Sequence, residues 1–145
     1  MYLKESIRHI LKEESLKKTL IDMVKNDGIE SASMLVGGVE NLLEILNIET
    51  PMDYLYLFND LEIVKDPEYP NWFLFVNESK YNLIAYNMNK DMVYIHLELV
   101  WYFLMNYFNM TYQEIQVLTE EWLSESYNLT GVQTHSGSQD FMESL

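Results

Sequence analysis

The sequence predicts an α+β domain in which helices come first, strands follow and helices return. Apolar residues recur at helical spacing over about the first fifty residues, short aromatic and β-branched runs alternate with turns over residues 61–96, and helical signals resume at residue 97. Helices and strands that are segregated along a chain favour α+β over a parallel α/β fold. We expect N-terminal helices, a three- or four-stranded antiparallel meander, and two C-terminal helices packed on the sheet.

The size and composition are those of a single folded domain. The chain has 145 residues, of which 48% are hydrophobic and 14% aromatic, enough for a core. We assign residues 1–130 to one domain, with a helical part at 1–50 and the meander and last helices at 53–130. The Gly-, Ser- and Gln-rich residues 131–145 are expected to form a loose tail, in which Phe141-Met142 could dock.

Residues 2–26 are expected to be helical. Two sets of apolar residues, slightly out of phase, indicate a bend near Glu14-Ser15 or two short helices. These sets are Leu3, Ile7, Ile10 and Leu11, then Leu16, Leu20, Met23 and Val24. Asn26-Asp27-Gly28 is a stop signal, because glycine adopts the left-handed conformation that ends many helices.

A helical corner follows, with helices over residues 29–36 and 39–47 and Gly37-Gly38 between them. We expect positive φ at Gly37 or Gly38, and burial of Leu42 or Leu43 and of Leu46. Thr50-Pro51 marks the end of this region. Residues 53–58 are ambiguous, because Asp53 could cap one helical turn or the alternating residues could begin a strand.

The meander is predicted from four short runs: LEIV (61–64), WFLFV (72–76), YNLIAY (81–86) and MVYIH (92–96). Residues 97–108 are apolar nearly all round, so a helix there is expected to be buried against the sheet. Thr111 and Glu114 form a capping box at the start of a helix that runs to about Ser126.

The net charge of −14 is unevenly distributed. Residues 1–26 carry six Lys/Arg and four Asp/Glu, whereas residues 27–145 carry three Lys and nineteen Asp/Glu. Such a body repels nucleic-acid phosphates, so nucleic acid is an unexpected partner. It could attract a basic protein surface, although an acidic surface also simply favours solubility.

Other signals concern location. No apolar run is long enough for a transmembrane helix, and the charged N-terminus lacks the apolar core of a signal peptide. The absence of cysteine excludes disulfides and thiol chemistry. We therefore expect a cytoplasmic protein with no membrane contact.

The corner segment LVGGVENLLEIL (35–46) has three interpretations. A phosphate-binding loop fails because its glycines are adjacent, no Lys follows, and a helix precedes it. A DNA-reading helix-turn-helix fits the small residues and leucines, but the outward positions of its second helix are Glu40, Asn41, Glu44 and Asn47, without a cation. A plain helical corner, able to contact a protein, is the preferred interpretation.

Catalytic, cofactor and metal sites lack support in the sequence. His96 and Glu98 share a face if the strand continues, but two ligands do not make a zinc site. No nucleophile motif or calcium loop is present, so we expect no enzyme activity, no cofactor and no metal.

The segments ASMLVGGVENLLEIL, NWFLF and LTEEWLSESYNL resemble parts of small uncharacterised proteins of bacteriophages and mobile elements. The resemblance covers most of the chain, but it implies no activity and no functional residues. It implies a small phage-encoded protein that acts in a host cell.

The preferred functional hypothesis is an inhibitor or adaptor that binds a basic protein surface. The candidate contact residues are Glu114, Glu120, Glu121, Glu125, Glu40 and Glu44. The alternatives are a self-associating or virion assembly subunit, in which basic N-terminal helices dock on a neighbour's acidic body, and an atypical helix-turn-helix regulator.

Overall fold

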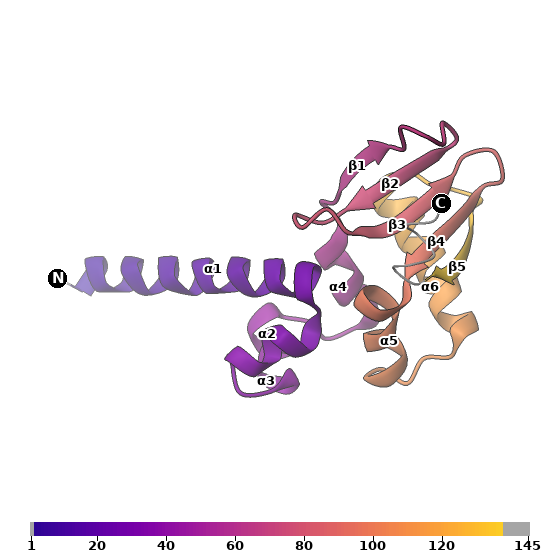
Figure 1. Ribbon diagram of the computed structural model, residues 1–145. Coiled ribbons are helices and arrows are strands. Elements are labelled where there is room, and N and C mark those ends of the chain that lie inside the picture. The colour runs from indigo at the N-terminus through magenta and orange to yellow at the C-terminus, as the bar shows by residue number, and fades with distance from the viewer. Residues whose placement is uncertain (1, 138–145) are drawn as a thin grey trace.

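The fold is α+β, with six α-helices and a five-stranded mixed sheet among the residues that the structure describes (Figure 1). The computed structural model describes residues 2–137, with side-chain packing from residue 14 onward. The expected α+β class is therefore confirmed. The arrangement differs in part from the prediction, because helices lie on both sides of the sheet and the sheet has a fifth strand.

The N-terminal helices are α1 (Tyr2–Asp27), α2 (Ile29–Leu35), α3 (Val39–Leu46) and α4 (Pro51–Leu55). α1 is one continuous helix without a kink in Figure 1, so neither the predicted bend near residue 14 nor the alternative of two short helices is found. Gly37 and Gly38 both have positive φ, and Leu42 and Leu43 are buried, which confirms the corner; Leu46 is only partly buried.

The ambiguous segment after the corner is helical. Thr50 and Asp53 form a capping box, in which the Asp53 carboxylate accepts from the Thr50 N–H and the Thr50 hydroxyl accepts from the Asp53 N–H. Pro51 therefore begins α4, because proline suits the first helical position, where no N–H is needed. A 3₁₀ turn, η1 (Tyr56–Phe58), follows.

The meander is confirmed as β1 (Glu62–Lys65), β2 (Trp72–Val76), β3 (Asn82–Asn87) and β4 (Met92–His96), all antiparallel. A fifth strand, β5 (Gln133–Gly137), pairs parallel with β4 and lies at the edge of the sheet. The prediction of three or four strands was wrong because it missed β5. Residues 133–137 form this strand and are not part of a loose tail. Phe141-Met142 lie outside the described residues.

The crossover from β4 to β5 contains the C-terminal helices. Residues 97–108 begin as a π-helical turn, η2 (Leu97–Trp101), and continue as α5 (Tyr102–Asn106); α6 (Tyr112–Tyr127) starts at the predicted Thr111–Glu114 capping box. Gln116 on α6 donates to the Thr134 carbonyl, and Glu120 accepts from the Thr134 N–H at 3.0 Å. These bonds hold β5 against α6.

The C-terminal end of α1 is held against the sheet by polar contacts that the sequence did not indicate. The buried Lys25 pairs with Asp60 at 2.7 Å, and its carbonyl accepts from the Asn77 amide at 2.8 Å. Removing the Asn77 amide would leave the buried Lys25 carbonyl without this partner, which lowers the free energy of unfolding by roughly 1–3 kcal/mol. The position of α1 is thereby fixed relative to β2.

Tyr127 joins α6 to the segment before β1 and makes stability sensitive to alkali. Its hydroxyl accepts from the Leu61 N–H and donates to the Phe58 carbonyl. Burial raises the pKa of this phenol from 10.0 to about 12. Because the folded state holds the proton more tightly than the unfolded chain, this stabilisation is complete below pH 10 and is lost as the pH rises towards 12.

Urea unfolding across that pH range measures the effect. We expect the free energy of unfolding to fall less steeply with pH in Tyr127→Phe than in the wild type. The same slope in both proteins would show that Tyr127 is not the group responsible.

Candidate functional site

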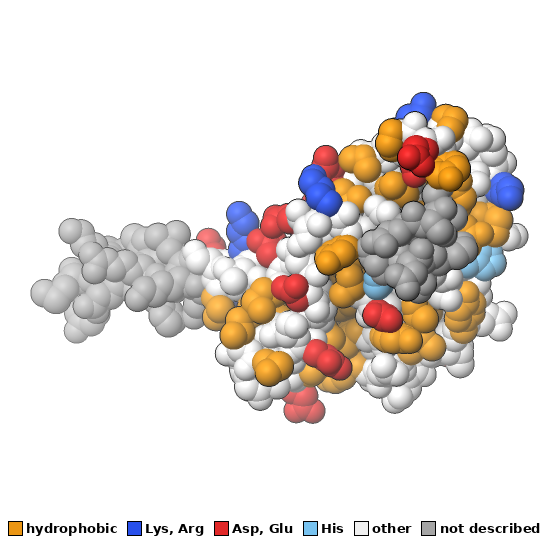
Figure 2. All heavy atoms as spheres, in the orientation of Figure 1, with side chains coloured by type: hydrophobic (Ala, Val, Ile, Leu, Met, Phe, Trp, Pro, Cys, Tyr) orange, Lys and Arg blue, Asp and Glu red, His pale blue; other side chains and the backbone are white. Residues whose placement is uncertain are grey.

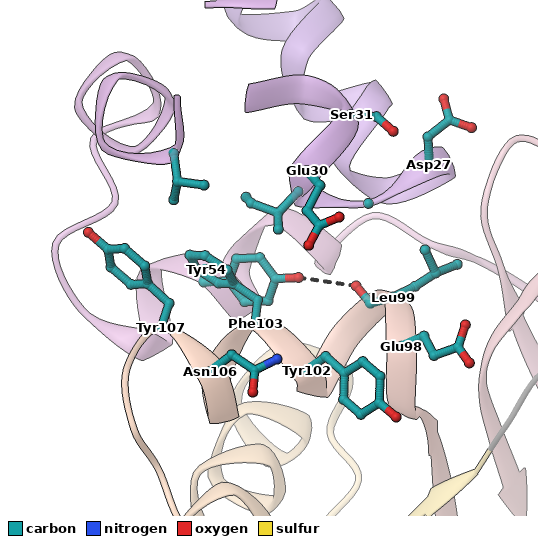
Figure 3. Close-up of a pocket in the computed structure, with 13 residues that line it drawn as sticks. Asp27, Glu30, Ser31, Tyr54, Glu98, Leu99, Tyr102, Phe103, Asn106 and Tyr107 are labelled. Carbon is teal, nitrogen blue, oxygen red and sulfur yellow. Dashed lines mark hydrogen bonds between the residues drawn. The ribbon is translucent and has the colours of Figure 1, made fainter. Parts of the chain in front are cut away.

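A cleft of about 490 Å³ opens between the α1–α2 junction and the η2–α5 segment (Figure 3). Its thirteen described lining residues come from α1, the α1–α2 turn, α2, α3, α4, η2, α5 and Tyr107, which directly follows α5. None of these lining residues is Lys, Arg or His. The cleft therefore has no internal cation to balance its carboxylates.

The floor of the cleft is aromatic. Tyr54 is fully buried, and its ring centroid lies 4.7 Å from that of Phe103. Phe103 in turn stacks on Tyr107 at 5.0 Å, with an interplanar angle of 13°. The Tyr54 hydroxyl donates to the Leu99 carbonyl at 3.1 Å, and burial raises the pKa of this phenol well above its usual range. The phenol thus stays a neutral donor that ties α4 to η2.

Three acidic residues line the cleft, and in Figure 3 the carboxylates of Asp27 and Glu98 point away from its aromatic floor. Asp27 ends α1, Glu30 lies in the first turn of α2, and Glu98 lies in η2 on the facing wall. In Figure 3 the Glu30 carboxylate reaches from α2 towards the Tyr54–Leu99 hydrogen bond. All three residues are exposed, so their charge is available to a ligand. A concave surface lined by one sign of charge concentrates ligands of the opposite sign.

Gly28 and His96 shape the two walls. Gly28 adopts φ +98° between α1 and α2, and Leu99 lies 3.6 Å from where its Cβ would be. A side chain there would therefore be strained by the backbone conformation rather than by the space. On the other wall, His96 Nδ1 accepts from the Leu99 N–H at 3.0 Å and caps η2. π-Helical turns are frequent at functional sites.

The rim carries exposed aromatic and amide groups. Tyr102 and Tyr107 are 42% and 40% exposed, although the apolar run at residues 97–108 led us to expect burial. Asn106 lies between them on α5 and is also exposed. Tyrosine faces bind cations through the ring quadrupole, and carboxylates bind guanidinium groups by paired hydrogen bonds. The cleft is chemically suited to a lysine or arginine side chain.

The glutamates predicted from the sequence lie elsewhere, on α6 and α3. Three of the α6 carboxylates already have partners: Glu114 accepts from the Thr111 N–H, Glu120 from Thr134, and Glu125 from the Tyr56 hydroxyl at 3.4 Å. The helix-cap bonds also lower the pKa of Glu114. Glu121 on α6 and Glu40 and Glu44 on α3 are exposed. Figure 1 shows α3 and α6 well apart, so these six glutamates do not form one site. On the face shown in Figure 2, acidic side chains are likewise scattered and do not gather in one patch.

The outer face of α6 carries a second depression of about 450 Å³, which we call the α6 groove. Met110, Val117 and Leu118 supply its apolar surface, and Glu114 and Glu121 are its two acidic lining residues. Val117 is 60% exposed. The groove follows one helix face, whereas the cleft lies between several elements.

The corner places its outward residues as the sequence implied. Glu40, Asn41, Glu44 and Asn47 are exposed on or next to α3, and the Asn41 amide donates to the Val36 carbonyl at 3.0 Å. That bond closes the glycine turn. Two of these four residues are acidic and none is basic, so we continue to expect no DNA affinity from this face.

Sequence reasoning missed Asp27, Glu30 and Tyr102, and considered Glu98 only as a metal ligand beside His96. His96 instead caps η2, as a histidine at a strand end often does. Across the residues described, no three His, Cys, Asp or Glu side chains are grouped as metal ligands would be. The one available signal was the placement of tyrosines on more than one side of the apolar run at residues 97–108.

No helix within the described part of the chain is long and apolar enough to cross a membrane. Comparisons with protein-family models, with curated proteins and with solved structures found no match, so the site is interpreted from its own chemistry.

Proposed function

We propose that the protein is an acidic binding protein that captures lysine and arginine side chains of a basic protein partner in the cleft. The observation that carries this proposal is the cleft itself, which has an aromatic floor and three exposed acidic lining residues, and in which no lining residue is cationic. The proposed setting is a cell interior, where the protein acts as an inhibitor or adaptor. The resemblance to phage proteins adds the proposal that the cell is a phage host.

The charge of the rest of the chain supports the same partner. Residues 27–145 have nineteen Asp/Glu against three Lys, which gives the body a strong negative potential. Such a potential accelerates the encounter with a basic surface and repels acidic ones. The cleft then supplies short-range selectivity, because its tyrosine rings favour a desolvated cation over a hydrated one.

Individual contacts in the cleft are expected to be weak. An exposed cation–π contact contributes about 0.5–1 kcal/mol, and an exposed ion pair about 0.2–1 kcal/mol. Useful affinity therefore needs several contacts at once. A partner with clustered Lys or Arg meets that need, whereas a single free amino acid does not.

The test is a fluorescence-anisotropy titration of the full-length protein with a labelled Lys/Arg-rich peptide. A peptide of equal length with Gln in place of the basic residues serves as the control. We expect saturable binding of the basic peptide at low salt, with an affinity that falls steeply as salt rises, because exposed charges are screened within about 8–10 Å at physiological ionic strength. No binding at low salt, or equal binding of the Gln peptide, would overturn the proposal.

A further inference from the structure

The first part of α1 extends away from the body of the molecule. Leu20 is the first buried residue of α1 among those whose side chains are described, and all but one of residues 14–19 are exposed. Figure 1 shows α2 and α3 beneath the C-terminal half of α1 only, with no other described element beside the start of the helix. We call residues 2–19 the arm. At 1.5 Å per residue it is about 27 Å long.

The arm is a cationic helix on an acidic protein. It contains five Lys/Arg and three Glu, and its apolar residues recur at helical spacing. In proteins most of the stability of a helix comes from packing of its amphipathic face, and Figure 1 shows no other described element beside the start of α1. The arm is therefore a candidate for packing against another molecule.

The α6 groove has the complementary chemistry. Glu114, Val117, Leu118 and Glu121 follow one face of α6 at helical spacing, with carboxylates at both ends and apolar side chains between. An amphipathic helix laid into such a groove buries its apolar residues and pairs its cations with the flanking carboxylates. The shallow groove suits a whole helix, whereas the deeper cleft suits single side chains.

We propose that the arm of one molecule docks in the α6 groove of a second copy, and that two copies exchange arms to form a closed dimer. The continuous helix directs the arm away from its own α6, so the contact is made between molecules (Figure 1). An exchange of identical arms satisfies two-fold symmetry and leaves no free groove. This inference is independent of the ligand proposed for the cleft.

Sedimentation of full-length variants tests the inference. An arm variant reverses Lys4, Arg8 and Lys12 to Glu, and a groove variant combines Glu121→Lys with Val117→Asp. A control variant, Glu44→Lys with Ile63→Asp, makes equivalent changes at exposed positions on α3 and β1. We expect a salt-sensitive dimer for the wild type and the control, and a dimer dissociation constant raised at least about tenfold in the arm and groove variants.

Mixing the arm variant with the groove variant is the decisive test. In a mixed dimer, the reversed arm meets the reversed groove and the native arm meets the native groove, so dimers should reappear. A wild type that is monomeric at low salt would overturn the inference. So would a groove variant that still dimerises, which would indicate that the arms pair with each other or bind the cleft. Failure of the mixture to associate would overturn it as well.

Discussion

Replacing Trp122 by alanine is expected to lower the free energy of unfolding by about 3–5 kcal/mol, the usual range for a fully buried tryptophan. Trp122 is completely buried, and its indole N–H donates to Asn59 Oδ1 at 2.6 Å. Its ring packs edge-on against Tyr127, which packs in the same way against Phe75 of β2. The substitution removes the buried ring that packs on Tyr127 and the hydrogen bond to the turn after η1, and urea unfolding followed by circular dichroism measures the loss.

Trp72 provides the matched comparison. It lies on β2, is only partly buried, and contacts Tyr94 at 5.8 Å between ring centroids. We expect Trp72→Ala to cost about 1–2 kcal/mol, within the range of ordinary single substitutions. Equal losses for the two variants would contradict the assignment of Trp122 to the centre of the core.

Reversing two cleft carboxylates is expected to abolish most binding of a basic peptide. In the variant Glu30→Lys with Glu98→Lys, each wall of the cleft acquires a cation that repels the ligand. We expect the dissociation constant to rise at least about tenfold, because like charges placed together at a contact cost several kcal/mol. Anisotropy titration at fixed ionic strength measures the change.

A control variant with the same net charge distinguishes the effect of contacts in the cleft from the effect of the overall negative charge. The variant Glu44→Lys with Glu68→Lys changes the total charge equally but alters exposed residues on α3 and in the β1–β2 turn. Its dissociation constant should rise less than about threefold, since only long-range attraction is reduced. If both variants bind equally weakly, affinity comes from net charge and the cleft confers no specificity.

Much of the fold could be predicted because its signals are local. Side-chain capping by Thr111 and Glu114 fixes the start of α6, and glycine at positions 37 and 38 allows the positive φ that the corner requires. The four meander strands were recognisable because short aromatic and β-branched runs alternate with turns. In each case, residues close in sequence determine the local structure.

The missed elements depend on partners that are distant in sequence. The run Gln133–Gly137 has weak strand propensity, and it becomes β5 because β4 and the side chains of Gln116 and Glu120 pair with its backbone. The predicted bend in α1 followed from a change of apolar phase. That change of phase does not interrupt the helix, in which the described buried positions begin only at Leu20.

The cleft could not be predicted for the same reason. Asp27, Tyr54 and Glu98 belong to three segments that only the fold brings together, and an abundance of carboxylates in the sequence does not distinguish one group from another. The acidic charge of the body led to the hypothesis of a basic partner, which stays a proposal. The proposed position of the contact needed the arrangement of α1, α2, η2 and α5.

The most direct measurement is an NMR titration of the ¹⁵N-labelled full-length protein with the Lys/Arg-rich peptide. The cleft proposal predicts that amide shifts concentrate at Gly28–Ser31 and at Glu98–Tyr107, the two facing walls. The Gln-substituted peptide should leave these amides unchanged. Shifts that spread evenly over acidic residues, or that fall on α3 and the outer face of α6 while the two walls stay unchanged, would contradict it.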